Sequence, residues 1–400
     1  MSTPVQDDLF HRLFEAEPHG EYARLRREGP VHPIALPTGA TAWLVTRYPD
    51  VRRALADPRL SKGGIVSPIG YLPGLPPEIH AGVARHMLTT DPPDHTRMRR
   101  LVAAAFTPRR VESLRPRIEQ ITGELLDRVA GRERFDLIDE LAFPLPIRVI
   151  CELIGVPPAD QGSFREWSNV LVAGMAAREQ LPAANRSMLG YVHGLIEAKR
   201  AEPADDLLSA LIAVRDEGDQ LSGPELTSTV FLLLIAGHET TVNLIGNGAY
   251  LLLTHPEQWD RLRARADELL PGAVEEFLRY ESPVQTATYR VTTEEVELGG
   301  VRIPAGQPVL ISLLSANRDE EQFADAGRFD VAREPGPHLA FGHGIHFCLG
   351  APLARLEGQV AFRALLTRYP MLRLAEPDAD PVWRPGTLMH GLAALPVAAH

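Results

Sequence analysis

The chain has 400 residues, of which 44% are hydrophobic and 23% are charged, as in a folded globular protein rather than a disordered one. Its 41 basic and 52 acidic residues give a net charge of −11, which argues against a nucleic-acid-binding protein. The only cysteines, Cys151 and Cys348, exclude a disulfide framework, a four-cysteine zinc site and a self-contained four-cysteine iron–sulfur cluster. Two distant thiols, and a polar segment 1–20 without signal-peptide features, predict a cytoplasmic protein.

The N-terminal part predicts a small β structure followed by an irregular region. Val31–Leu36 and Ala42–Thr46 have the composition of a strand pair. Residues 63–90 are rich in glycine and proline and show little periodicity. A loop of this length in a compact domain usually carries a function or is disordered.

Helical periodicity dominates the middle of the chain. An apolar stripe with three- and four-residue steps predicts an amphipathic helix over residues 111–129, whose regular part begins near Pro116. The stripe consists of Val111, Leu114, Ile118, Ile121, Leu125 and Val129. Phe164–Val172 and Ser187–Arg200 predict a further pair of helices.

The most apolar stretch lies within Gly223–Thr254 and predicts one helix, roughly 50 Å long at ~1.5 Å per residue. It is apolar on almost all sides, so we expect it to cross the centre of the fold. The polar residues from Gly237 to Thr241, with Asn243 and Asn247, are more than a membrane helix tolerates. The sequence therefore predicts a buried helix in a soluble protein.

Short β-type segments follow Pro283, at Ala287–Val291, Val296–Ile303 and Val309–Ser312. A loop rich in glycine and histidine spans Pro335–Phe347, and a last amphipathic helix is predicted from about Leu349 to Tyr369. The predicted class is mainly α with small β-sheets, in a single domain over residues 1–400. Its β-containing part covers about 30–60 and 284–312, and its helical bulk covers about 95–281 and 349–369.

The segment Phe341-Gly342-His343-Gly344-Ile345-His346-Phe347-Cys348-Leu349-Gly350 places a cysteine at the start of a predicted helix, where a thiolate is favoured. Its glycines let the backbone approach something flat and bulky. Three interpretations compete. A zinc or copper site could use His343, His346 and Cys348, but no fourth ligand is evident. A lone cysteine is by default structural. Thiolate ligation of haem iron alone explains why phenylalanine, three glycines and cysteine precede a helix together.

The long helix carries Ala236-Gly237-His238-Glu239-Thr240-Thr241 at its middle. Thr240 can hydrogen-bond back to the carbonyl of Ala236 and open the helix locally, while Gly237 lets a ligand approach the backbone. An acid beside a hydroxyl suits proton delivery, although a hydrogen-bonded polar notch in a buried helix is an equal alternative. A zinc-protease motif would need a second histidine at Val242 and is excluded.

Two other spacings place polar residues on one helix face. Glu276 and Arg279 are three residues apart, which taken alone indicates a surface ion pair. His95 and Arg99 are four apart, just after the turn at Asp91-Pro92-Pro93. Two donors on one face suit an anionic group, whereas a solvated basic helix start is the alternative.

Together, and in this order, the four segments resemble the cytochrome P-450 family of haem-thiolate monooxygenases, and the resemblance covers essentially the whole chain. The cysteine-loop motif is highly specific, Ala-Gly-x-Glu-Thr is fairly specific, and Glu-x-x-Arg is weak by itself. Residues 233–245 and 338–348 are similar to the soluble actinobacterial branch, which oxidises macrolides, other polyketides and related natural products. The resemblance implies the P-450 fold, a triangular prism with a long central helix over the haem.

The resemblance also implies a role for each matching residue. Cys348 would be the proximal ligand of the iron in haem b, and Glu239 and Thr240 would serve oxygen activation. The haem propionates would be bound by His95, Arg99, Arg290 and His346. Other cofactor contacts would come from Ala236, Gly237, Phe341, Gly342 and Gly350. A buried network supporting the cysteine side would consist of Glu276, Arg279 and Arg328.

The implied reaction inserts one oxygen atom of O2 into a C–H bond or an alkene and reduces the other atom to water. Electrons would come from a separate ferredoxin and its NAD(P)H-dependent reductase, because the chain has neither the cysteines for an iron–sulfur module nor the length for a flavoprotein. A monomer without nucleic-acid or membrane partners is expected.

The substrate pocket is expected where the family places it, with mostly apolar lining residues that could equally be plain core. They are Met87, Leu88, Val170, Leu171, Leu233, Ala236, Val284, Ala287, Leu388 and Met389. The loop 63–90 holds a single acid, Glu78, so a neutral polyketide, macrolactone, terpenoid or steroid-like molecule is favoured over an amino-sugar macrolide. The alternatives are a peroxide-driven peroxygenase, a phenol-coupling enzyme of the same fold and, least favoured, a non-enzymatic haem sensor.

Overall fold

A computed structural model describes residues 9–14, 17–36, 39–63, 83, 85–173, 179–214 and 220–399 of the chain. Its α-helices are α1 (Leu9–Phe14), α2 (His19–Glu28), α3 (Tyr48–Ala56), α5 (Asp94–Ala105), α6 (Pro108–Ser113), α7 (Arg115–Arg128), α8 (Pro144–Ile154), α9 (Gln161–Ala173), α10 (Leu181–Ala201), α11 (Leu207–Ala213), α12 (Gly223–Thr254), α13 (Pro256–Ala264), α14 (Ala266–Tyr280), α15 (Leu313–Ala316) and α16 (Ala351–Arg368). Within the described ranges, the other helical elements are a π-helical turn, η1 (Ile138–Ala142), and two 3-10 turns, η2 (Pro158–Asp160) and η4 (Gly344–His346).

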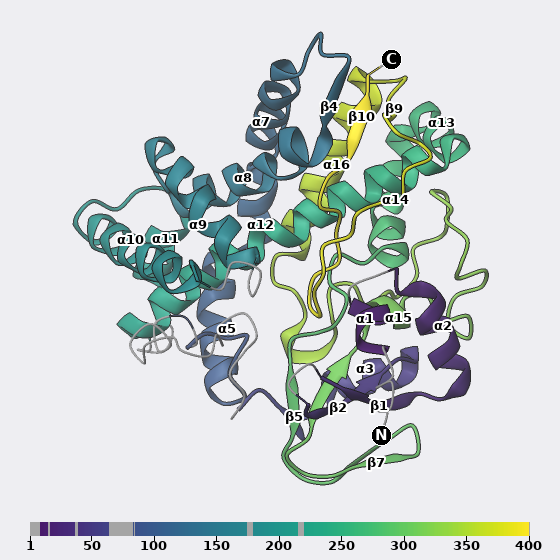
Figure 1. The fold of residues 1–400 in the computed structure, drawn as a ribbon. Helices are drawn as coiled ribbons and strands as arrows, with labels where there is room; N and C mark the ends of the chain where they lie inside the picture. The colour runs from purple at the N-terminus through teal and green to yellow at the C-terminus, as the bar shows by residue number, and fades with distance from the viewer. Residues whose placement is uncertain are drawn as a thin grey trace.

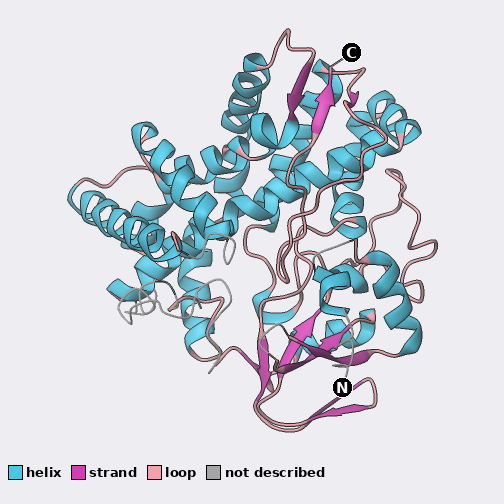
Figure 2. Cartoon of the chain, viewed as in Figure 1, coloured by secondary structure: helices cyan, strands magenta, loops and turns pink. Residues whose placement is uncertain are grey.

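The strands form three small sheets. They are β1 (Val31–Ala35), β2 (Thr41–Val45), β3 (Leu60–Ser61), β4 (Arg134–Asp136), β5 (Arg290–Thr292), β6 (Val296–Leu298), β7 (Val301–Ile303), β8 (Pro308–Ile311), β9 (Arg373–Leu374) and β10 (Pro396–Ala398). The largest sheet has the order β1-β2-β8-β5-β3, in which only β2 and β8 are parallel, with Leu44 opposite Leu310. A second sheet has the order β4-β10-β9, and β6 and β7 form a hairpin. Figure 2 shows the largest sheet at one end of the molecule and the β4-β10-β9 sheet at the other.

The largest sheet is covered on both faces because its side chains alternate. Val45 of β2 packs in a cluster with residues of α3, whereas its neighbour Leu44 packs with residues of α1 and α2. The same alternation separates Ile311 from Leu310 on β8. The sheet thus buries its two faces under short helices, while the main core of the molecule is helical.

The central helix α12 has the predicted bounds. Ser222 and Glu225 form a capping box at its N-terminus, with the Ser222 amide donating to Glu225 Oε2 at 2.8 Å. Pro256 follows its last turn and begins α13. The helix packs against α8, α10, α14 and α16, and Figure 1 shows it crossing the middle of the molecule. This burial explains why it is apolar on nearly all sides.

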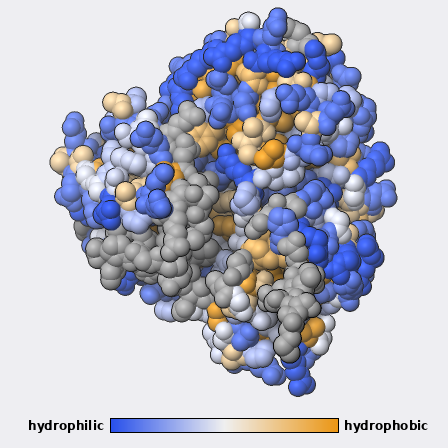
Figure 3. All heavy atoms as spheres, viewed as in Figure 1, coloured by the Kyte–Doolittle hydropathy of each residue, from blue (hydrophilic) through white to orange (hydrophobic). Residues whose placement is uncertain are grey.

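Among the described residues, α12 is the one helix long and apolar enough to span a membrane. Within its most hydrophobic stretch 78% of residues are buried inside the protein, as in the core helix of a soluble protein. On the face shown in Figure 3, hydrophilic residues dominate the periphery, and apolar residues reach the surface in separate patches rather than as a belt. Helix α12 therefore uses its hydrophobicity for the core.

The predicted elements differ from the observed ones mainly where glycine or proline intervenes. Gly299 and Gly300 have φ angles of +55° and +80°, so the single strand predicted over Val296–Ile303 turns back on itself as β6 and β7. The helix predicted from residue 111 begins as the separate α6, and α7 carries Pro116 in its first turn. Of the predicted strand Ala287–Val291, only the last two residues lie in β5.

Candidate active site

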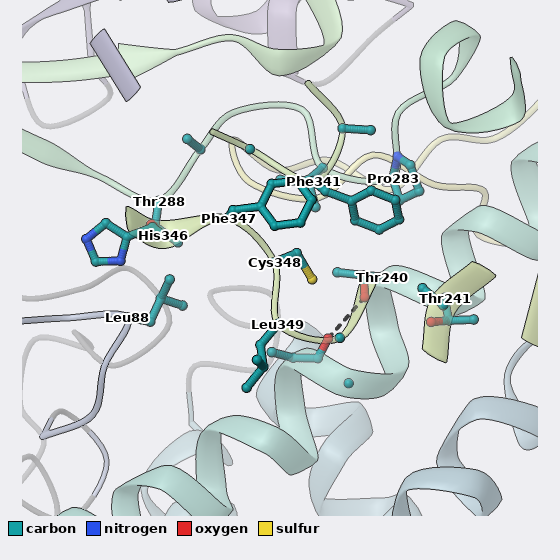
Figure 4. Close-up of a pocket in the computed structure, with 18 of the residues that line it drawn as sticks. Leu88, Thr240, Thr241, Pro283, Thr288, Phe341, His346, Phe347, Cys348 and Leu349 are labelled. Carbon is teal, nitrogen blue, oxygen red and sulfur yellow. Dashed lines mark hydrogen bonds between the residues drawn. The ribbon is translucent and has the colours of Figure 1, made fainter. Parts of the chain in front are cut away.

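The cysteine loop is shaped by two glycines in the left-handed region. Gly342 and Gly344 have φ angles of +74° and +76°. A Cβ atom on Gly344 would lie 3.1 Å from the carbonyl oxygen of Leu55, so this position has no room for a side chain. The loop closes with the Cys348 amide donating to the Phe341 carbonyl at 2.9 Å. Figure 4 shows the sulfur of Cys348 pointing into a pocket, with Thr240 of α12 nearby.

The electrostatic surroundings of Cys348 act in two directions. Cys348 is exposed toward the open pocket, yet the protein packed around its thiol desolvates it and raises its pKa, whereas the amides of Gly350 and Ala351 and the guanidinium groups of Arg99 and Arg355 oppose that rise. The net direction is upward, which differs from the thiolate expected at a helix N-terminus. A thiol in this position becomes a thiolate when a metal cation replaces its proton.

Three consecutive side chains of α12 face three different surroundings, because each helical residue is rotated by about 100° from the one before. The Thr240 hydroxyl donates to the Ala236 carbonyl at 3.0 Å, as predicted, and Thr240 lines the pocket. Glu239 faces away from the pocket and accepts a 3.0 Å hydrogen bond from Arg384. His238 is buried against α9, where its Nε2 lies 2.9 Å from the Ser168 hydroxyl.

Glu239 is an incompletely satisfied acid. It is 2% exposed, its Oε1 accepts from Arg384, and its Oε2 is buried without a hydrogen-bond partner in the described part of the chain. Burial raises the pKa of the Glu239 carboxyl, and Arg384 opposes the rise. Arg384 was not predicted as a site residue, because no motif in the C-terminal sequence indicates that it contacts α12.

Gly237 lines the pocket and also allows α8 to pack closely against α12. A Cβ atom there would lie 3.1 Å from Ile150 Cδ1 of α8. The glycine lines the pocket together with Ala236, as expected, but the close approach it allows is that of helix α8. A larger residue would push α8 away from α12.

The four nitrogen-bearing side chains that the resemblance assigned to the haem propionates converge beside the cysteine loop. His95 and Arg99 come from α5, Arg290 from β5 and His346 from η4. The rings of His95 and His346 meet edge to face with centroids 4.5 Å apart, and Arg99 donates to the Phe347 carbonyl at 2.6 Å. Both ring nitrogens of His95 and the Nε of Arg290 are buried without partners among the described residues. The cluster holds more donors than the protein satisfies.

The charges of this cluster repel one another. Burial and then the positive charges of Lys62 and Arg290 lower the pKa of His346 to about 2. Burial also lowers the pKa of Arg290 to about 10. Lys62 was missed by the sequence analysis; it is buried and donates to the Thr288 and Tyr289 carbonyls at 2.8 and 3.2 Å. An anionic ligand with carboxylates would satisfy both the orphaned donors and the excess positive charge.

Glu276 and Arg279 form a buried pair rather than the surface pair that their spacing alone indicated. Arg279 donates from Nε and a terminal nitrogen to the two oxygens of Glu276 at 2.7 and 2.8 Å. Its other terminal nitrogen donates to the Asn317 and Ala326 carbonyls, both at 3.0 Å. Both side chains are 2% exposed or less, so the pair is protected from water.

The structure corrects the expected third member of this network. The Arg328 side chain is 66% exposed and lies 3.7 Å from Asp330, so it contributes only its backbone carbonyl to the Arg279 guanidinium. Its expected place is taken by Arg333, which donates to Glu276 Oε1 at 3.2 Å. Arg333 also donates to the Arg328 carbonyl at 3.0 Å. A turn in which the Arg333 amide donates to the Asp330 carbonyl at 3.0 Å precedes this contact, and the Arg333 side chain is 19% exposed whereas that of Arg328 is in solvent.

Most of the expected substrate residues line one pocket with Cys348 and Thr240. The lining includes Met87, Leu88, Leu233, Ala236, Val284, Ala287, Leu388 and Met389. Val170 and Leu171 do not line it; both lie half-buried on α9. Residues outside the predicted substrate set also line the pocket, among them Leu232, Thr241, Thr288 and Leu313. Residues 64–82 and 84 of the predicted loop, including Glu78, lie outside the described residues.

Comparison with known proteins then identifies the family. A model of the family "Cytochrome P450" matches residues 187–390. Cytochrome P450 107B1 of Saccharopolyspora erythraea is 53% identical, over 99% of this chain and 99% of its own.

The chain belongs to the cytochrome P450 family.

Two other P450s support this placement. The 6-deoxyerythronolide B hydroxylase of the same organism is 49% identical over 98% of each chain. A solved structure of the P450 monooxygenase TamI with bound tirandamycin C is 49% identical, covers 98% of this chain and 99% of its own, and superposes with a TM-score of 0.87. The fold class and the enzyme class predicted from the sequence, a P450 monooxygenase of the bacterial type, are confirmed.

P450 membership identifies a haem-thiolate iron as the cofactor, and the residues fit it. Cys348 is the cysteine that reaches the pocket, and the orphaned donors of His95 and Arg290 suit propionate carboxylates. The zinc or copper alternative finds no support: among the described residues, the one group with metal-ligand spacing is His19, Glu281 and His390, without Cys348. P450 monooxygenases use O2, a lipophilic substrate and redox partners that supply electrons.

Proposed function

We propose that this P450 hydroxylates or epoxidises a large, neutral, lipophilic natural product of the polyketide or macrolactone kind. The observation that carries the proposal is the pocket itself, in which Cys348 and Thr240 lie among mainly apolar side chains. The polar side chains that α12 contributes to the pocket are the hydroxyls of Thr240 and Thr241, and a third hydroxyl, Thr288, lies beside His346 (Figure 4). Hydroxyl groups and apolar walls suit a substrate with few charges. The similarity to a 6-deoxyerythronolide B hydroxylase supports this substrate class.

The proposed cofactor is haem b. Cys348 would ligate its iron through Sγ, and His95, Arg99, Arg290 and His346 would hold its propionates. Phe341, Gly342 and Gly350 line the pocket beside Cys348 and would contact the same group. When bound, the haem-thiolate supplies the oxidising chemistry that the side chains of the protein lack.

The protein's own contribution is to place a proton and to exclude water. Thr240 Oγ1 lies in the pocket and is oriented by its bond to the Ala236 carbonyl. Glu239 lies on the next helix position and connects to Arg384, whose side chain is 34% exposed. We infer that a proton passes from the surface by way of Glu239 to Thr240 Oγ1, which requires Glu239 to leave Arg384. Leu233, Val284 and Met389 restrict the access of water.

The proposed electron source is a separate ferredoxin with its NAD(P)H-dependent reductase, and the enzyme is proposed to act as a cytoplasmic monomer. The peroxide-driven alternative has no observation in its favour, because Thr240 gives the pocket a hydroxyl and Glu239 places an acid at the adjacent position of α12, the two groups that dioxygen chemistry needs. Isotopically labelled O2 distinguishes the two routes. With ferredoxin, reductase and NAD(P)H, we expect one labelled oxygen atom in the product, whereas product formed with peroxide alone would overturn the proposal.

The substrate class is tested by titrating the haem-loaded enzyme with natural-product scaffolds and recording the spin-state change of the iron. We expect macrolactones without sugars to bind more tightly than their amino-sugar derivatives. A set of matched pairs, each a macrolide and its aglycone, makes the comparison independent of ring size. Tight binding of amino-sugar macrolides but not of their aglycones would contradict the proposed neutral substrate.

A further inference from the structure

A second group of metal-ligating side chains lies outside the pocket, where three distant parts of the chain meet. His19 is the first residue of α2, Glu281 directly follows α14, and His390 belongs to the C-terminal segment 383–390. The two imidazole Nε2 atoms and a carboxylate oxygen of Glu281 all lie within 4.8 Å of one another. Neither the P450 reaction nor the pocket uses these residues.

The contacts show how closely the three ligand atoms converge. His19 Nε2 lies 2.7 Å and His390 Nε2 lies 2.6 Å from the same oxygen, Oε1 of Glu281. The second oxygen, Oε2, accepts a hydrogen bond from Arg318 at 3.1 Å. The Trp383 ring stacks on the His390 ring with centroids 4.3 Å apart and planes 14° from parallel. Arg318 and Trp383 thus fix the carboxylate and one imidazole in place.

The cluster is buried but has an opening. Glu281 and His390 are buried, whereas the His19 side chain is 16% exposed. At this opening Glu17 Oε1 lies 3.7 Å from His19 Nε2, and the Glu17 side chain is 56% exposed. A cation can therefore enter past His19 and Glu17. With the histidines neutral, Glu17 and Glu281 carry one more negative charge than Arg318 neutralises.

We propose that His19, Glu281 and His390 form a binding site for a divalent transition-metal ion, best suited to Zn²⁺. Two imidazole nitrogens and one carboxylate oxygen are ligands that zinc binds in tetrahedral sites, with water or Glu17 as the fourth. On binding, each neutral ring moves its proton from Nε2 to Nδ1 and presents the Nε2 lone pair to the metal. Glu281 Oε1, which accepts from both Nε2–H groups in the metal-free protein, then becomes a metal ligand.

The metal would join parts of the enzyme that are far apart in sequence. His390 directly follows Met389, which pairs with Val284 in an isolated β-bridge and lines the substrate pocket. The same C-terminal segment carries Arg384, the partner of Glu239. A bound metal would therefore clamp this segment to α2 and α14, and would stabilise the folded state by mass action.

The test uses the haem-loaded enzyme, stripped of loosely bound metal with a chelator and then titrated with Zn²⁺ alone. We expect saturable binding of one zinc per chain, measured by calorimetry and by the zinc-to-iron ratio after dialysis, together with a higher Tm. In His19→Gln the amide still donates to Glu281, so the fold is retained, but an imidazole ligand is lost. Its zinc affinity should fall by at least ~10- to 100-fold.

His193→Gln is the matched control, because His193 is an exposed histidine on α10 far along the chain from the cluster. This variant should bind zinc as the parent does. No stoichiometric zinc on the parent enzyme, or equal affinity and equal zinc-induced Tm shifts in the parent and His19→Gln, would overturn the proposal and leave the three residues as a hydrogen-bonded triad. Neither outcome depends on the substrate or on turnover.

Discussion

Two buried glutamates of this P450 are paired with arginines, and the pairs are built differently. Glu276 receives two hydrogen bonds from Arg279, one from Arg333 and one from the Asp330 amide, all inside the protein. Glu239 receives one, from a partly exposed arginine, and leaves an oxygen without a partner in the described part of the chain.

The difference matches the position of each pair. A carboxylate whose oxygens all accept hydrogen bonds is held in place. Arg279, the partner of Glu276, donates to the Asn317 carbonyl, and Asn317 Oδ1 accepts from the Leu339 amide at 2.6 Å, which connects this pair to the start of the cysteine loop. A buried carboxylate with a free oxygen and a single outer partner can exchange that partner at small cost. Glu239 lies beside Thr240, where the proposed chemistry needs a group that moves. The cysteine side is thus fixed and the α12 side is adjustable.

The largest expected effect is at the fixed side. Cys348→Ala should abolish the strongly red-shifted Soret band of the ferrous–CO complex and all turnover, because no other cysteine reaches the pocket. Cys151→Ala is the control; Cys151 is buried in the helical core and should keep the band. An unchanged band in Cys348→Ala would refute the ligand assignment.

Removing Arg279 should be the next most severe change. Arg279→Met leaves the Glu276 carboxylate buried with half of its partners, which costs about 3–5 kcal/mol of unfolding free energy. Denaturant unfolding and haem content measure the loss. Arg265→Met, at the N-cap position just before the same helix, removes a pair of identical spacing, Arg265–Glu268, whose side chains are half or more exposed. That control should change stability little, and equal losses in both variants would show that burial of the Glu276 pair is unimportant.

On the adjustable side, Thr240→Ala should leave folding and haem binding intact but lower the product formed per electron consumed by roughly 10- to 100-fold. The hydroxyl that places the proton is then missing. Thr254→Ala removes the same kind of bond, from Thr254 Oγ1 to the Tyr250 carbonyl at 2.8 Å, at the far end of α12. Full coupling in Thr240→Ala, or equal uncoupling in Thr254→Ala, would count against the proton-relay role.

The smallest expected effect is a shift in pH dependence. Arg384 opposes the burial that raises the pKa of Glu239, so Arg384→Leu should raise that pKa further. Because ionising Glu239 in the folded state then costs more, the variant should be destabilised relative to the parent more at alkaline than at acidic pH. The inflection of coupling against pH should move upward. Arg128→Leu, at an exposed arginine, is the control, and an unmoved inflection in Arg384→Leu would separate Glu239 from the reaction.

What could be predicted from the sequence was local. The bounds of α12, the Thr240 bond to Ala236 and the cysteine-loop residues follow from spacing and motif within a short window. The partners Arg384, Arg333 and Lys62 could not be predicted in this way, because each reaches its site from a segment whose place depends on tertiary packing. The predictions for Arg328, which is exposed, and for Val170 and Leu171, which lie outside the pocket, were wrong for the same reason. A motif predicts which residues are close in the chain, but not the direction in which each side chain points.

The C-terminal segment 383–390 also sets when this enzyme can be completed during its synthesis. A chain leaves the ribosome N-terminus first, and its earlier parts begin to fold while later ones are still being added. Helix α12 is made well before Arg384, Leu388 and Met389, which supply its counter-charge and part of the pocket wall. A nascent or truncated chain that stops just short of residue 383 would therefore carry every family motif, and even its cysteine loop, without a finished active site.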